Sequence, residues 1–210
     1  MINSNLMVKG IKAIIPGGIS DNDFATVAGI DRISAKEILS SLVQHGIGKW
    51  NHTEVMFDDS DRLKTAFFTI SNGVPVEDVS EHLSWKDFEA LVGQILDEFG
   101  FEVEKNLILT KPRMEIDVIG VKLGIVLLID CKHWKKMSNS ELSQIVKKQI
   151  DRVKRYVNQI NGIMAVPVIV TLHQEEVTFI KRVPIVPIMQ LASFLEGFYG
   201  NLEQINTIER

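Results

Sequence analysis

Apolar and polar positions in the first 57 residues alternate in short runs. Apolar side chains recur at helical spacing over residues 6–15, 20–30 and 33–45, which predicts three short helices. Residues 47–57 then alternate well enough for two short strands joined by a turn. The start of the chain is therefore predicted to be a small, mainly helical region that ends in a hairpin.

Later in the chain, strand patterns alternate with longer helical ones. Residues 58–83 favour a helical connector, and we place a boundary near residue 80, which predicts domains of residues 1–80 and 81–210. The second domain is predicted to be α/β, with a mixed sheet flanked by helices, because a long helix between strands favours a parallel crossover. The predicted elements are helices over residues 84–99, 138–160 and 189–198, and strands over 101–109, 113–122, 125–134, 163–172 and, at an edge, 184–188.

The clearest hairpin pattern has its turn at Leu123 and Gly124. That turn places Asp117 opposite Asp130, whereas a slip of one residue would separate the two carboxylates. Side chains alternate along a strand, so Lys132 shares a face with Asp130, about 6.6 Å further along. Burying carboxylates at the end of an apolar strand is costly without a counter-ion. We therefore expect a metal ion beside them.

Each helix that flanks this hairpin carries one polar residue near its apolar stripe. Glu89 lies about 20° from Leu96 around the helix of residues 84–99. It could be a boundary residue that reaches water, but the neighbouring hairpin favours a glutamate that faces the core. Gln149 lies in the centre of the stripe of residues 138–160. It could face the carboxylates or be a core glutamine bonded to backbone, and the pattern leaves both open.

Charge is distributed unevenly along the 210 residues, whose net charge is −4. Residues 132–155 hold eight cations and two carboxylates, a net charge of +6, which indicates a surface for phosphate groups. The single cysteine excludes an internal disulfide and a multi-cysteine zinc site. No apolar run approaches the roughly 18 residues that span a bilayer, so we expect a cytoplasmic protein without a membrane segment.

Glu89, Asp117 and the run Asp130-Cys131-Lys132 follow one another with gaps of 27 and 12 residues, and a basic helix comes next. This pattern resembles the PD-(D/E)XK nuclease superfamily, particularly the restriction-endonuclease-like branch with Mrr-type enzymes and archaeal Holliday-junction resolvases. The resemblance covers residues 84–198. Ile116 stands where the family name expects proline, and Asp130 stands where glutamate is common.

The resemblance implies a restriction-endonuclease-like fold and a metal-dependent DNA endonuclease. It implies that Mg²⁺ or Mn²⁺ is held by Glu89, Asp117, Asp130 and the backbone carbonyl of Cys131. Lys132 would orient the attacking water and stabilise charge on the scissile phosphate. The expected catalytic set is Glu89, Asp117, Asp130, Lys132 and Gln149, and the expected DNA contacts are Lys135, Lys136, Lys147, Lys148 and Arg152, with Lys36 in the first domain.

The first 57 residues resemble a winged helix-turn-helix, with residues 33–45 as the recognition helix. Their five basic and five acidic residues leave DNA reading and a packing or dimerisation role both open. An inactive DNA-binding or regulatory protein, and a partner of a helicase or repair enzyme, are the alternatives to catalysis. Cutting both strands usually requires two active sites, so a C2 homodimer is compatible with the leading hypothesis.

Overall fold

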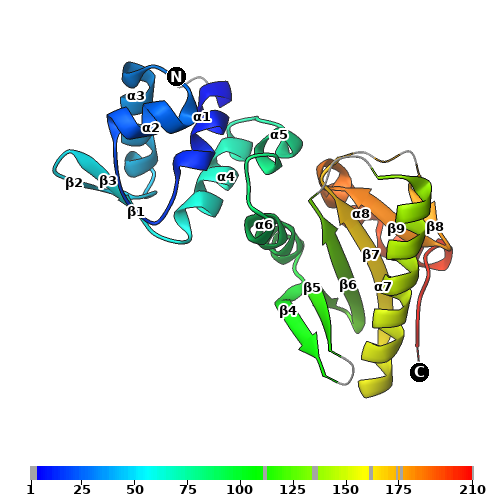
Figure 1. Ribbon diagram of the computed structural model, residues 1–210. Coiled ribbons are helices and arrows are strands. Elements are labelled where there is room, and N and C mark those ends of the chain that lie inside the picture. Colours follow the sequence, from blue (N-terminus) through cyan, green and yellow to red (C-terminus); the bar gives the residue numbers. More distant parts are fainter. Residues whose placement is uncertain are drawn as a thin grey trace. The chain divides into compact units, whose positions relative to one another are not determined.

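A computed structural model of the chain describes residues 4–110, 113–133, 137–160, 163–173, 175 and 177–209. The chain divides into two compact units, Met1–Asp87 and Phe88–Arg210. The division falls in the first turn of helix α6 (Trp85–Glu98). Figure 1 shows the helices and strands of each unit.

The first unit is mainly helical, with a small three-stranded sheet of order β1-β3-β2. Ser20 and Asp31 begin two of its helices, since their side chains accept hydrogen bonds from the backbone N–H groups of Asp23 and Ser34. Strand β1 lies outside the predicted elements because two of its four residues are glycine. The elements are α1 (Ser4–Gly10), a 3-10 turn (Ile11–Ala13), β1 (Gly17–Ser20), α2 (Asp21–Ala28), α3 (Arg32–Gln44), β2 (Lys49–Asn51), β3 (Glu54–Phe57), α4 (Asp61–Ser71) and α5 (Val76–Ser80).

The second unit is a mixed six-stranded sheet of order β4-β5-β6-β7-β9-β8 with helices against it, as the sequence predicted. Figure 1 shows the long helix α7 running along this sheet. Ser138 and Glu141 form a capping box that begins α7. The elements after α6 are β4 (Glu102–Leu109), β5 (Met114–Lys122), β6 (Ile125–Lys132), α7 (Asn139–Gln159), β7 (Met164–Thr171), β8 (Phe179–Ile180), β9 (Val183–Pro187), two 3-10 turns (Ile188–Gln190 and Tyr199–Gln204) and α8 (Leu191–Gly197).

The register of the β5–β6 hairpin is the predicted one. Lys122 pairs with Ile125 at the turn, and the ladder continues to Val118 opposite Ile129. The next positions along the two strands are Asp117 and Asp130, so both carboxylates lie where the hairpin ends. Strand β7 runs parallel to β6, as expected for a strand that follows a long crossover helix.

The predicted edge strand is wrong in its position. Strand β9 lies inside the sheet, where Ile185 pairs with Ile169 of β7 and Pro184 pairs with Phe179 of β8. Proline suggested an edge because it has no N–H for a neighbouring strand. Two-residue β8 covers only the start of β9 and forms the edge itself.

Helices α6 and α7 cover opposite faces of the sheet. A Cβ atom added to Gly120 of β5 would lie 3.4 Å from the Leu96 side chain of α6. The neighbouring Ile119 packs instead in a buried cluster with Val153 and Tyr156 of α7. Because successive side chains of a strand point to opposite faces, the site at the end of this hairpin lies between two helical layers.

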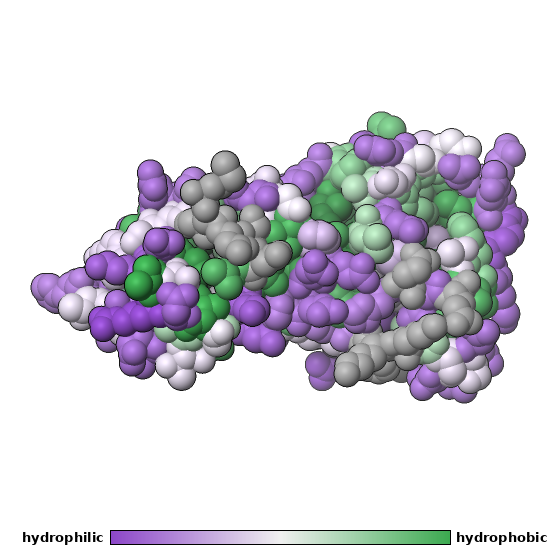
Figure 2. Space-filling view, turned by 90° about the horizontal axis from the view of Figure 1, so that it is seen from above, coloured by the Kyte–Doolittle hydropathy of each residue, from purple (hydrophilic) through white to green (hydrophobic). Residues whose placement is uncertain are grey.

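None of the helices that the structure describes combines the length and apolar character needed to cross a membrane. On the face shown in Figure 2, hydrophilic residues cover much of the surface, with hydrophobic patches between them.

Candidate active site

Asp130, at the end of β6, is a buried carboxylate paired with two cations. Only 3 % of the residue is exposed. Its Oδ2 lies 2.8 Å from Nζ of Lys132 on the same strand, and its Oδ1 lies 2.8 Å from a guanidinium nitrogen of Arg152 on α7. The side chains of Asp130 and Lys132 therefore lie on the same face of β6, as the sequence predicted. Two cations offset the cost of burying one carboxylate.

Asp117 occupies the facing position on β5 and turns toward β6. Its Oδ2 accepts a hydrogen bond of 2.7 Å from the backbone N–H of Cys131. Burial and, after it, the negative charge of Asp130 raise the pKa of Asp117 to about 6, against the opposing effect of that hydrogen bond. Two carboxylates thus lie close enough to repel each other.

Cys131 takes part in this site through its backbone. The thiol is fully buried, and burial raises its pKa well above the usual value, so it stays protonated at neutral pH.

Glu89 of α6 is buried, with 6 % of the residue exposed, which excludes a boundary glutamate that reaches water. Burial is the main reason that its pKa rises to about 7, and the charges of Asp117 and Glu115 add to the shift, while Lys132 lowers it. Glu89 thus shares one electrostatic environment with the carboxylates of the hairpin.

Gln149 and Arg152 connect α7 to the same strand. The Gln149 side chain is fully buried, and its Nε2 donates a 2.8 Å hydrogen bond to the carbonyl of Leu128. Its Oε1 accepts one of 3.2 Å from Arg152, which also binds Asp130. Gln149 therefore combines the two roles that the sequence left open. It is bonded to the backbone, and it reaches the Asp130 carboxylate through Arg152.

Arg152 corrects one expectation. It was expected to contact DNA together with the other cations, yet its guanidinium turns inward to Asp130 because a long side chain can reach around the stripe. Its place in the site was missed, although it follows Gln149 by three residues and so lies beside it on the helix.

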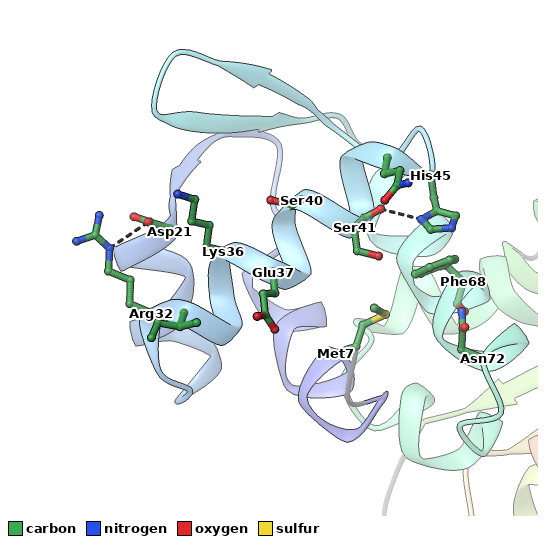
Figure 3. Close-up of a pocket in the computed structure, with 12 residues that line it drawn as sticks. Met7, Asp21, Arg32, Lys36, Glu37, Ser40, Ser41, His45, Phe68 and Asn72 are labelled. Carbon is green, nitrogen blue, oxygen red and sulfur yellow. Dashed lines mark hydrogen bonds and ion pairs between the residues drawn. The ribbon is translucent and has the colours of Figure 1, made fainter. Parts of the chain in front are cut away.

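The other predicted DNA contacts are spread over the chain. Lys147 and Lys148 are exposed on α7, while Lys135 and Lys136 lie outside the described residues. Lys36 lies on α3 in the first unit, where it lines a surface pocket of about 1060 Å³ together with Ser40 and other residues. Figure 3 shows Lys36 and its neighbours at this pocket.

The side chains of the cluster do not form a closed metal site as they lie. Among the described residues, no three His, Cys, Asp or Glu side chains gather closely enough to hold a metal as they lie. Asp130 is engaged by Lys132 and Arg152, and Asp117 by the Cys131 amide. The chemistry nevertheless fits a hard cation, because the charge of Asp117 helps to raise the pKa of Glu89 and the charge of Asp130 helps to raise the pKa of Asp117. In addition, the buried Oδ2 of Asp130 makes an ion pair with Lys132 but no hydrogen bond.

Residues 80–174 match the family described as Restriction endonuclease (Mrr_cat). This stretch contains the whole cluster from Glu89 to Arg152. An uncharacterized protein of Archaeoglobus fulgidus is 29 % identical over 126 residues, which are 58 % of this chain and 97 % of that protein.

Two solved structures also resemble the chain. A protein from Vibrio cholerae is 16 % identical, with a TM-score of 0.43, and the match covers 97 % of this chain and 53 % of that one. The chain thus spans about half the length of that relative. The small subunit of the heterodimeric restriction endonuclease R.BspD6I is 16 % identical, with a TM-score of 0.37, and the match covers 57 % of this chain and 72 % of that one.

Proposed function

We propose that the protein is a Mg²⁺- or Mn²⁺-dependent endonuclease that hydrolyses phosphodiester bonds in DNA, and the match of residues 80–174 to the restriction endonuclease family supports this proposal. One observation carries this proposal. Two carboxylates and an ammonium group meet where the β5–β6 hairpin ends, and the pKa of one of them, Asp117, is raised to about 6. Perturbed carboxylates beside a lysine are typical of active sites.

Each residue of the cluster has a role in this reaction. Asp117 and Asp130 would hold the metal with Glu89 and the carbonyl of Cys131. The bound ion would polarise the scissile phosphate and lower the pKa of an attacking water. Lys132 would place its ammonium beside that water and the charge that develops on the phosphate. Gln149 and Arg152 would hold Asp130 in place from α7.

The basic face of α7 supports a nucleic-acid substrate. Lys147 and Lys148 are exposed on this helix, where ammonium groups can pair with phosphates and hold the backbone in register without reading its sequence. Binding through such contacts should weaken steeply as salt rises. A C2 homodimer would supply the two active sites that cutting both strands requires.

We assign the first unit as a winged-helix module. The order α1, β1, α2, α3 and a β2–β3 hairpin, joined into one three-stranded sheet, supports this assignment. Lys36 on α3 would then contact DNA. Arg32 on the same helix pairs with Asp21 at 3.0 Å, which reduces the positive charge that α3 offers to phosphates.

Two substitutions test catalysis. Asp117→Ala and Lys132→Ala should each abolish Mg²⁺-dependent cleavage while the far-ultraviolet circular dichroism spectrum stays unchanged. Lys154→Ala, at an exposed position of α7, is the matched control for loss of a lysine and should still cleave. A panel of linear, flapped, junction and methylated DNA with each metal identifies the substrate. Full activity of either site variant would exclude the assignment.

One observation favours a second candidate, a DNA-binding or regulatory protein without catalysis. Lys132 and Arg152 already neutralise Asp130 without a metal. In that case calorimetry on the purified protein would detect no Mn²⁺ binding, although DNA affinity at low salt would remain. A protein that lacks DNA affinity as well would instead fit a partner of a DNA-processing complex.

A further inference from the structure

Asn106 has an unusual backbone conformation in the strand next to Asp117. Its φ is +56°, in the left-handed region that few residues other than glycine adopt. The β4–β5 ladder pairs Lys105 with Val118 and Leu107 with Ile116, so Asn106 faces Asp117 between these two pairs. A strained position inside a strand therefore lies directly beside a candidate metal ligand.

At Asn106, the odd-numbered residues of β4 switch from one face of the sheet to the other. Before Asn106, the side chains of Val103 and Lys105 lie against α6. A Cβ atom added to Gly93 of that helix would lie 3.3 Å from the Val103 side chain and 3.4 Å from the Lys105 side chain. After it, Leu107 and Leu109 pack in the cluster that contains residues of α7. A regular strand would keep all four on one side.

Strand β5 makes the same change at Asp117. On one side of it, Gly120 faces Phe101 and Leu96 on the α6 face of the sheet. On the other side, Ile116 and Met114 pack in the cluster with α7. All three positions are even-numbered and would share a face in an undistorted strand. The two strands thus exchange faces together, at the facing positions Asn106 and Asp117.

The exchange explains how Asp117 reaches β6. Where a strand changes face, one residue leaves the regular extended conformation and its side chain is re-aimed, as at β-bulges beside active sites. The Asp117 carboxylate accepts the 2.7 Å hydrogen bond from the Cys131 N–H, across the hairpin. Asparagine suits the partner position because it tolerates the left-handed region better than most residues.

We propose that Asn106 is a positioning residue whose left-handed backbone holds the Asp117 carboxylate at the Cys131 amide. Its consequence for metal binding rests on the proposed function. The backbone conformation carries the effect, so glycine should replace Asn106 without loss, whereas a β-branched residue should not.

The experiment compares Asn106→Gly, Asn106→Val and the milder Asn106→Ala. Leu123, with φ of +49° in the β5–β6 turn and 81 % exposure, provides the matched control Leu123→Val. The first measurement is the amide proton shift of Cys131 in ¹⁵N-labelled, metal-free protein, which reports the bond to Asp117. The second is Mn²⁺ affinity by calorimetry. Thermal unfolding shows which variants fold.

Asn106→Gly should keep the Cys131 shift and the Mn²⁺ affinity, and Asn106→Val should move the shift upfield and weaken Mn²⁺ binding about tenfold. Asn106→Ala should give a Cys131 shift and a Mn²⁺ affinity between those of the glycine and valine variants. If the valine variant does not fold, the alanine variant provides the test. Leu123→Val should change neither signal. An unchanged Cys131 shift in Asn106→Val or Asn106→Ala would overturn the proposal, as would a glycine variant as impaired as valine. Absence of Mn²⁺ binding in the unaltered protein would refute the proposed function, while the Cys131 shift would still test Asn106.

Discussion

Replacing Glu89 with glutamine should stabilise the metal-free protein at alkaline pH. Glu89 is buried in α6, and its pKa is raised from the usual 4.5 to about 7 by burial and by the charge of Asp117. At pH 8 the Glu89 side chain of the unaltered protein is therefore ionised in an environment that favours the neutral form. Glutamine has almost the same shape and carries no charge, so Glu89→Gln removes that cost.

The magnitude follows from the two pKa values. The folded state keeps a proton on Glu89 at pH values where the unfolded state has lost it, so the stability due to this group is complete below about pH 4.5 and is lost as pH rises to about 7. At about 1.4 kcal/mol for each unit of pH, the loss is on the order of 3 kcal/mol. Glu89→Gln should therefore be more stable than the unaltered protein by up to about 3 kcal/mol at pH 8, and by less than about 1 kcal/mol at pH 5.

Urea unfolding at pH 5 and pH 8, in the presence of a chelator, measures this difference. Glu98→Gln is the matched control, because Glu98 lies exposed on the same helix. It should change the free energy of unfolding by less than about 0.5 kcal/mol at both pH values. Adding Mg²⁺ at pH 8 should stabilise the unaltered protein more than Glu89→Gln, since binding to the folded state alone raises stability.

Equal stability of Glu89→Gln and the unaltered protein at both pH values would refute this reasoning. That result would mean that the glutamate is solvated and belongs to no carboxylate cluster. Destabilisation at pH 8 would refute it as well, because it would show that the ionised side chain is already compensated without a metal.

Three further predictions concern α7. Arg152→Met should lower the free energy of urea unfolding by about 1–3 kcal/mol, since it removes one of the two cations at buried Asp130. The control Lys154→Met, at an exposed position, should change the free energy of unfolding little, and equal effects of the two substitutions would contradict the pairing of Arg152 with Asp130. Gln149→Met should cost about 1–3 kcal/mol because its carbonyl partner on β6 loses a donor, and an unchanged unfolding midpoint would count against that bond. Lys148→Ala should weaken DNA binding to the same extent for every sequence and lower the slope of log affinity against log salt by about 1, which fluorescence anisotropy can measure; a slope equal to that of the unaltered protein would remove this lysine from the interface.

The sequence by itself determined most of the elements and the centre of the candidate site. The β5–β6 register could be predicted because a two-residue turn and the period-two alternation of side chains leave one pairing that buries both strands. Glu89 and Gln149 could be singled out because helical spacing brings both toward the core. These inferences depend on neighbours in the chain, where spacing alone sets which side chains share a face.

Only the tertiary structure decided the contacts that connect distant segments. Arg152 turns to Asp130 because its side chain is long enough to reach around α7, a choice that helical spacing does not encode. Strand β9 lies inside the sheet because β8, 2 residues long, pairs with it from outside. The exchange of faces at Asn106 and Asp117 depends on how two strands pack against two helices at once. Packing between segments far apart in the chain selects one among several local conformations of similar energy, and that selection arises only when the chain folds.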